Sequence, residues 1–257
     1  MKFQFSRFLL VMAMLFVVGT VSEAQQFQAL LFTKTNGFHH VSINEGVDAI
    51  RELGNRHAFN VDWQEDPSVF NDNRLKKVDV IIFLNTTGDI LNDEQQAAVE
   101  RFIQSGKGFV GIHSAADTEY DWPWYTQLVG RMFHIHPQIQ TAVIHVEDKL
   151  FPGTEQIPAN WLWTDEWYQY DEEKTDGLKY ILSLDETTYD PNVQWGEKKG
   201  GPMGFHPMAW YHDFDGGRAF YTGLGHMPEC YSDPVFRNFL YGGIYWAATG
   251  KGMHKKM

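Results

Sequence analysis

Two histidines follow apolar runs of the sequence and are the first candidates for chemistry. His113 comes directly after the apolar run 108–112, and His40 closes the polar segment 33–40 that follows the apolar run 27–32. Imidazole is the side chain whose ordinary pKa suits proton transfer near neutral pH. One such histidine is more often a capping or packing residue, but two on neighbouring loops indicate a shared crevice.

Further polar residues stand in loop-like segments of the second half, most of them beside glycine or proline. They are His134 and His136 before Pro137, Asp165 and Glu166, His206 before Pro207, and His226 after Gly225. Glu166 lies in the aromatic segment 161–170, where partial burial is expected to raise the pKa of a carboxyl toward the range of an acid or base. An ordinary pair of surface charges stays open as the alternative.

A divalent metal site is a second use for these side chains. His134 and His136 share one face of a strand, and His-x-His is a zinc-ligand spacing, but Pro137 favours loop packing instead. The sequence contains no H-E-x-x-H motif. No cofactor is therefore predicted, and a divalent metal held by scattered ligands stays open.

The elements that must position these residues alternate in the first half. Apolar runs at 27–32, 59–63, 78–84 and 108–112 predict strands. One helix is expected to start after Ser42, and another to run from Asn92 or Asp93 to Gly106. Such alternation predicts a parallel sheet that is covered on both faces. Ligands of such sheets collect at the carboxyl ends of the strands, where His40 and His113 stand.

The second half has a different pattern. Segments 139–147, 180–184, 208–212 and 218–221 predict strands with hairpin-like spacing, and 213–217 predicts the turn between the last two. Segment 151–176 is rich in Trp, Tyr and Pro and shows weak periodicity. A final helix is expected after Ser232 or Asp233. The sequence shows no internal repeat or linker, so residues 25–257 are predicted to form a single domain.

Composition excludes several classes of protein. The 257 residues are 43% hydrophobic and carry a formal charge of −12, so nucleic acid is not expected as a partner. The single cysteine, Cys230, rules out an internal disulfide and a cysteine-based zinc site. It is expected to be a packing residue.

The first 24 residues have the pattern of a signal peptide. Lys2 and Arg7 precede the apolar run 8–18, and Ser22 and Ala24 supply the small residues that a signal peptidase reads. We expect cleavage before Gln25, export to the periplasm or beyond the cell, and no stable membrane insertion afterwards. An uncleaved membrane anchor is the alternative.

Six motifs along the chain together resemble the trehalose-utilisation (ThuA-like) family over about residues 27–250. They are Thr33-Lys34-Thr35-x-Gly37-Phe38-x-His40-x-Ser42-Ile43, Gly111-Ile112-His113-Ser114-Ala115, Phe133-x-x-His136-Pro137, Asp165-Glu166-x-Tyr168, His206-Pro207-x-x-Trp210 and Gly223-x-Gly225-His226. The resemblance implies an α/β fold, the flavodoxin-like, class I glutamine amidotransferase-like three-layer sandwich, with a mostly parallel central sheet and an aromatic-rich second half.

The resemblance also implies a site. His113 stands where the wider superfamily has a nucleophilic cysteine, so thiolate-dependent glutamine amidotransfer is not expected. Relatives accompany sugar oxidoreductases, which implies a small carbohydrate, a sugar or a 3-keto sugar, as the substrate. Isomerisation, elimination and hydrolysis stay open. Candidate catalytic residues are His40, His113, Glu166, His206 and His226, and candidate substrate-binding residues are Asp117, His136, Tyr168 and Trp210.

Roles follow from that placement. His113 is the expected leading acid or base, Glu166 its complement, and His226 or His206 the group that stabilises charge on oxygen. Tyr168 and Trp210 are expected to face a sugar ring. A carbohydrate-binding protein without turnover and a metal-dependent hydrolase are the alternatives. The oligomeric state is not predicted.

Overall fold

A computed structural model describes residues 25–252 of the chain. The predicted signal peptide, residues 1–24, lies outside the described residues. Among the described residues, no helix combines the length and the apolar character needed to cross a membrane.

One nine-stranded sheet forms the centre of the structure, and its first five strands are parallel. Their order across the sheet is β2, β1, β3, β4 and β13. The third and fourth strands along the chain are buried at every residue, as expected where both faces are covered. The bounds of these strands are β1 Gln28–Phe32, β2 Asn60–Gln64, β3 Val80–Leu84, β4 Gly108–Ile112 and β13 Gly217–Thr222.

The other side of the sheet is antiparallel. It continues from β13 through β12, β9 and β6 to β7. Two small sheets, β5–β8 and β10–β11, stand beside it. The bounds are β12 His206–Phe214, β9 Lys179–Asp185, β6 Gln140–Val146, β7 Trp161–Asp165, β5 Phe133–Ile135, β8 Gln169–Tyr170, β10 Val193–Trp195 and β11 Lys198–Gly200.

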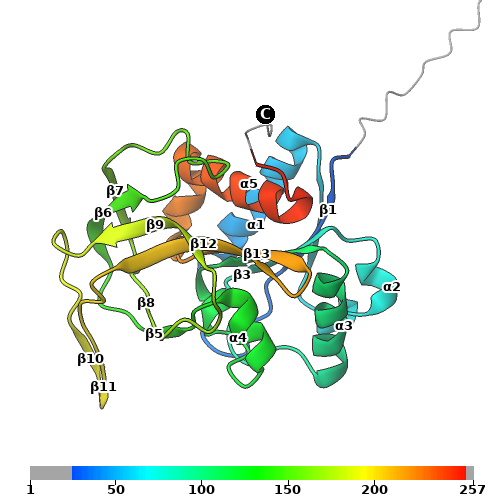
Figure 1. The fold of residues 1–257 in the computed structure, drawn as a ribbon, viewed down its shortest axis with the longest axis horizontal. Helices are drawn as coiled ribbons and strands as arrows, with labels where there is room; N and C mark the ends of the chain where they lie inside the picture. The colour runs from blue at the N-terminus through cyan, green and yellow to red at the C-terminus, as the bar shows by residue number, and fades with distance from the viewer. Residues whose placement is uncertain (1–24, 253–257) are drawn as a thin grey trace, which may run out of the picture.

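Helices cover the sheet on both faces. Figure 1 shows α1 (Ile43–His57) and α5 (Pro234–Thr249) on one face, and α3 (Asp93–Gln104) and α4 (Pro123–Val129) on the other. A single-turn helix, α2 (Asp72–Leu75), packs beside α3. This three-layer α/β arrangement confirms the expected fold class.

Helix α1 starts directly after Ser42, as predicted, but the serine hydroxyl makes other contacts than those of a helix cap. Ser42 is the N-cap residue, but its side chain does not cap the helix. Its hydroxyl instead donates to the carbonyl of Gly225, 3.2 Å away, and accepts from the Asn85 amide at 2.9 Å. The serine therefore ties the helix start to the loop that follows β13.

Candidate functional site

Four segments meet at the carboxyl edge of the parallel strands. The loop after β1 carries His40, the turn after β4 begins with His113, and the loop after β13 carries His226. Glu166 directly follows β7 on the antiparallel side. The edge that parallel strands share thus brings residues from distant parts of the chain together, as the sequence predicted.

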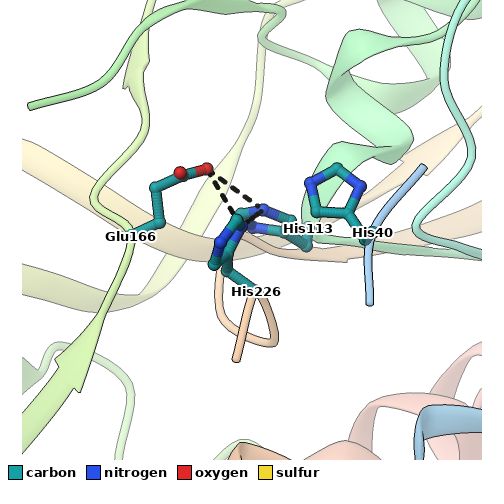
Figure 2. A group of neighbouring side chains, drawn as sticks. All are labelled: His40, His113, Glu166 and His226. Carbon is teal, nitrogen blue, oxygen red and sulfur yellow. Dashed lines mark hydrogen bonds and ion pairs between the residues drawn. The ribbon is translucent and has the colours of Figure 1, made fainter. Parts of the chain in front are cut away.

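His40, His113, Glu166 and His226 form one compact group, called here the His/Glu cluster. Each residue offers one nitrogen or oxygen atom, and these atoms all lie within 4.8 Å of one another. Nε2 of His113 lies 3.1 Å from Nδ1 of His226 and 3.5 Å from Oε2 of Glu166. Figure 2 shows Glu166 and His40 on opposite sides of His113 and His226.

The His113 side chain is held by an unusual backbone conformation and by two hydrogen bonds. Its φ of 50° lies in the left-handed region, which costs a non-glycine residue energy and is common at functional sites. Nδ1 lies 2.9 Å from the carbonyl of Gly223, so it carries the proton and donates. The Tyr221 hydroxyl donates to the His113 carbonyl at 2.7 Å. Nε2 therefore faces the cluster.

His226 is positioned by a residue that the sequence left undecided, Asp165. The fully buried Asp165 carboxylate accepts from the backbone N–H groups of Gly225 at 2.8 Å and Met227 at 3.3 Å, on either side of His226. It also accepts from the N–H of Glu166 at 3.0 Å. Asp165 thus fixes two members of the cluster at once, and the surface-charge alternative for this pair is wrong.

Glu166 is the carboxylate that the imidazoles share. Its Oε2 lies 3.2 Å from Nδ1 of His226, and its Oε1 lies 3.2 Å from Nε2 of His136. Burial raises the pKa of Glu166, but hydrogen bonds from His113 and His226 outweigh it and leave the pKa below its ordinary value. The expected rise in this pKa is therefore wrong, because Glu166 is surrounded by hydrogen-bond donors as well as by apolar rings.

The pKa values of the two outer histidines of the cluster move in opposite directions. Burial, followed by the neighbouring His113 and His226, lowers the pKa of His40 to about 2, so it stays neutral. Burial also lowers the pKa of His226, but its hydrogen bond to Glu166 and the charge of that carboxylate outweigh this effect and raise it. The cluster therefore combines a carboxylate with an imidazole whose protonated form that carboxylate favours.

Three predicted substrate-binding residues lie around the cluster. The ring of Tyr168 lies 4.2 Å from that of His113, centroid to centroid, and is buried. His136 contacts Glu166 and keeps 24% of its side chain exposed. Asp117 accepts from the Tyr120 hydroxyl at 2.7 Å, and burial raises its pKa.

Two predicted site residues lie elsewhere, and their expected placement is wrong. His206 is buried outside the cluster, with Nδ1 at 3.0 Å from Glu186 and Nε2 at 2.8 Å from the Tyr168 carbonyl. Trp210 is fully buried, stacks on Tyr221 and donates to the carbonyl of Val129. Both residues belong to β12, which is covered on both faces, so their side chains pack into the interior.

Solvent reaches the cluster at His226 and, to a smaller extent, at Glu166. His40 and His113 are buried, whereas His226 keeps 17% and Glu166 keeps 7% of the side chain exposed. A ligand approaching the site therefore meets His226, Glu166 and His136 first. Three imidazoles and a carboxylate at such distances suit proton transfer, and the same donor set suits a divalent metal ion.

Similarity to known proteins agrees with this architecture. The family model described as trehalose utilisation matches residues 28–247. A putative ThuA-like protein from Bacteroides uniformis superposes with a TM-score of 0.74 at 24% identity, covering 90% of this chain and 96% of that one. A second putative ThuA-like protein, from Parabacteroides merdae, gives 0.68 at 20% identity, covering 89% and 92%.

More distant likeness shows the fold alone. A β-galactosidase from Bacillus circulans superposes with a TM-score of 0.52 at 13% identity, covering 87% of this chain but 30% of that one. No curated protein matches the chain in sequence.

Proposed function

Because the chain belongs to the trehalose-utilisation (ThuA) family, we propose that it is a carbohydrate-active enzyme that transfers protons on a sugar or a 3-keto sugar at the His/Glu cluster. One observation carries the proposal: a buried carboxylate, Glu166, is shared by His113, His136 and His226, and two of these imidazoles, His136 and His226, keep part of the side chain exposed. Such an arrangement holds an acid and a base in fixed positions.

The exposed fraction of each side chain decides which residue can contact the substrate. His113 has no exposed side-chain surface, so in this proposal it acts on the substrate through His226. Nδ1 of His226 faces Glu166 and His113, which leaves Nε2 of His226 for the substrate. Glu166 orients that imidazole and stabilises its protonated form.

A ketone in the substrate makes this proton transfer sufficient for reaction. A base removes the proton from the carbon next to the carbonyl, and the electron pair moves onto the carbonyl oxygen, where a protonated imidazole stabilises it. When the deprotonated carbon carries a hydroxyl, transfer of the hydroxyl proton to the oxygen of the former carbonyl and return of the abstracted proton to the former carbonyl carbon give an isomer with the carbonyl moved by one carbon. Departure of an oxygen substituent from the neighbouring carbon, with a proton supplied to the leaving oxygen, gives elimination.

The test is a screen of the purified mature protein against glycosides and their 3-keto derivatives. We expect consumption of at least one compound, and a loss of about 100-fold or more in kcat/KM for Glu166→Gln and His226→Ala. His212→Gln is the matched control, because His212 is buried outside the cluster and donates from Nε2 to the Leu128 carbonyl. Binding without turnover of any compound would favour the carbohydrate-binding alternative.

A metal-dependent hydrolase is the second candidate, and the mutual distances within the cluster favour it. His40, His113, Glu166 and His226 would hold a divalent ion, and their donor set fits zinc. The hydrogen bond from His113 to the Gly223 carbonyl is the kind of support that metal-bound histidines have. A bound ion would supply Lewis-acid polarisation of a substrate oxygen. Stoichiometric metal in protein purified without an affinity tag, lost in Glu166→Gln, supports this candidate, and full turnover in chelator excludes it.

Export is a separate proposal. It is supported by the N-terminal pattern of Lys2, Arg7, the apolar run 8–18 and the small residues Ser22 and Ala24.

A further inference from the structure

A groove lies next to the His/Glu cluster, between the segment after β5 and the β10–β11 hairpin. Its volume is about 500 Å³, within the usual range for small-molecule sites. The side chains that the argument uses are His136, Gln138, Gln140, Asn192, Gln194 and Trp195. We propose that this groove, called here the Trp195 groove, binds a second, neutral sugar ring of the substrate while the first ring reacts at the cluster.

His136 joins the groove to the cluster. On one side its Nε2 lies 3.2 Å from Oε1 of Glu166. On the other side its ring meets that of Trp195 edge to face, with the centroids 4.6 Å apart and an angle of 87°. The His136 ring therefore stands between a ligand in the groove and the Glu166 carboxylate of the cluster.

The lining of the groove suits a neutral polyhydroxylated ring. Trp195 keeps 45% of its surface exposed, so an aromatic face is available on which a sugar ring can pack. Four amide side chains also line the groove, and an amide can both donate to and accept from hydroxyl groups. The NH₂ groups of Gln140, Asn192 and Gln194 already donate within the protein, but their remaining hydrogen-bonding capacity faces the groove together with that of Gln138. The one carboxylate of the lining, Asp190, already accepts from the backbone and side-chain N–H groups of Asn192. The residues that line the groove include no lysine or arginine, so the groove offers no cationic partner for an anionic ligand.

The hairpin that carries Trp195 is fixed to the cluster by Gln169. This buried glutamine donates to the Pro191 carbonyl at 2.5 Å and accepts from the N–H of Gly201 at 2.9 Å, so it holds both ends of the hairpin. Gln169 follows Glu166 by three residues. One short segment thus positions the carboxylate and the groove together, as a site that spans both rings requires.

The inference rests on the proposed function, because it takes the cluster as the place where the first ring reacts. It is tested by binding, which does not require turnover. Calorimetric titrations compare methyl glucoside with the disaccharides trehalose, maltose and cellobiose, on the wild type, Trp195→Ala and Trp195→Phe. Phe205→Ala is the matched control, because Phe205 is an exposed aromatic residue that does not line the groove.

We expect at least one disaccharide to bind the wild type about ten-fold more tightly than methyl glucoside. Trp195→Ala should remove that preference, Trp195→Phe should retain most of it, and Phe205→Ala should leave it unchanged. Equal binding of the disaccharides by wild type and Trp195→Ala, or no preference for any disaccharide, overturns the inference.

Kinetics separate this inference from the proposed function. Turnover of a 3-keto disaccharide that Trp195→Ala leaves unaffected refutes the groove and keeps the proposed function. Disaccharide binding that depends on Trp195, without turnover of any 3-keto compound, keeps the groove and refutes the proposed function.

Discussion

Replacing Asp165 with asparagine tests whether this buried carboxylate holds the site together. In the wild type, Oδ2 accepts from the N–H of Gly225 and from the Cys230 thiol, while Oδ1 accepts from the N–H groups of Glu166 and Met227. The side-chain carbonyl oxygen of asparagine can accept from only one of these two pairs of donors. Its amide NH₂ then faces a second donor, so one backbone N–H loses its partner.

The magnitude follows from the bonds that are lost. A buried N–H without a partner costs about 1–3 kcal/mol, and the remaining bonds lose the contribution of the negative charge. We therefore expect Asp165→Asn to lower the free energy of unfolding by about 3 kcal/mol, which corresponds to a Tm lower by roughly 6–12 °C. Because Gly225 and Met227 flank His226, we also expect turnover to fall at least about ten-fold.

Urea unfolding followed by circular dichroism measures the first effect, and the sugar assay measures the second. Asp233→Asn is the matched control, because Asp233 accepts from the N–H groups of Val235 and Phe236 at the start of α5, where asparagine caps equally well. It should stay within about 0.5 kcal/mol of the wild type. An Asp165→Asn protein as stable and as active as this control would refute the positioning role.

Three further predictions concern other parts of the chain. Cys230→Ser should leave turnover within a few-fold, because the buried thiol donates to Asp165 and serine keeps a donor there; complete loss of turnover in a folded variant would reopen thiol chemistry. Burial lowers the pKa of His212, so the folded state binds fewer protons there than the unfolded chain, and stability should fall as the pH drops below about 6.5. Urea unfolding at pH 7.0 and 5.5 should show that His212→Gln loses less stability between these pH values than the wild type does, by at most about 1.4 kcal/mol per pH unit. The same pH dependence in both proteins would contradict the lowered pKa of His212. Mass spectrometry of the native protein should place the N-terminus at or near Gln25, and retention of Met1 contradicts export by cleavage.

The alternating half of the fold could be predicted from the sequence because its signals are local. The four apolar runs became β1 to β4, and the Asn92 cap begins α3 with a capping box. The aromatic segment 151–176 was less informative, since β8 has only two residues and pairs with β5 rather than with the neighbouring β7. Helix α4 was also missed; it is seven residues long and starts at Pro123 without a side-chain cap.

The residues of the candidate site also differ in whether local sequence signals could predict their positions. His40 and His113 were expected at one edge because parallel strands end there, and the structure places them in one cluster. The sequence could not show that Asp165 accepts from the backbone N–H groups of Gly225 and Met227, since these lie in a loop 60 and 62 residues away. It also could not show that Trp210 faces the interior, because a strand that is covered on both faces gives no polar alternation to indicate direction.

The position of β13 in the sheet has a consequence for how the chain folds. This strand is made from residues 217–222, yet it pairs with β4 on one side and β12 on the other, in the middle of the sheet. During synthesis, the edge of β4 stays unpaired for the 104 residues that separate Ile112 from Gly217. An apolar strand with an open edge is prone to aggregate, and such long-range pairing is slow. A truncated or stalled chain that ends before residue 217 lacks β13, so its parallel strands β1 to β4 would stay separate from the antiparallel strands. We therefore expect a chaperone that shields the edge of β4 to raise the yield of folded protein.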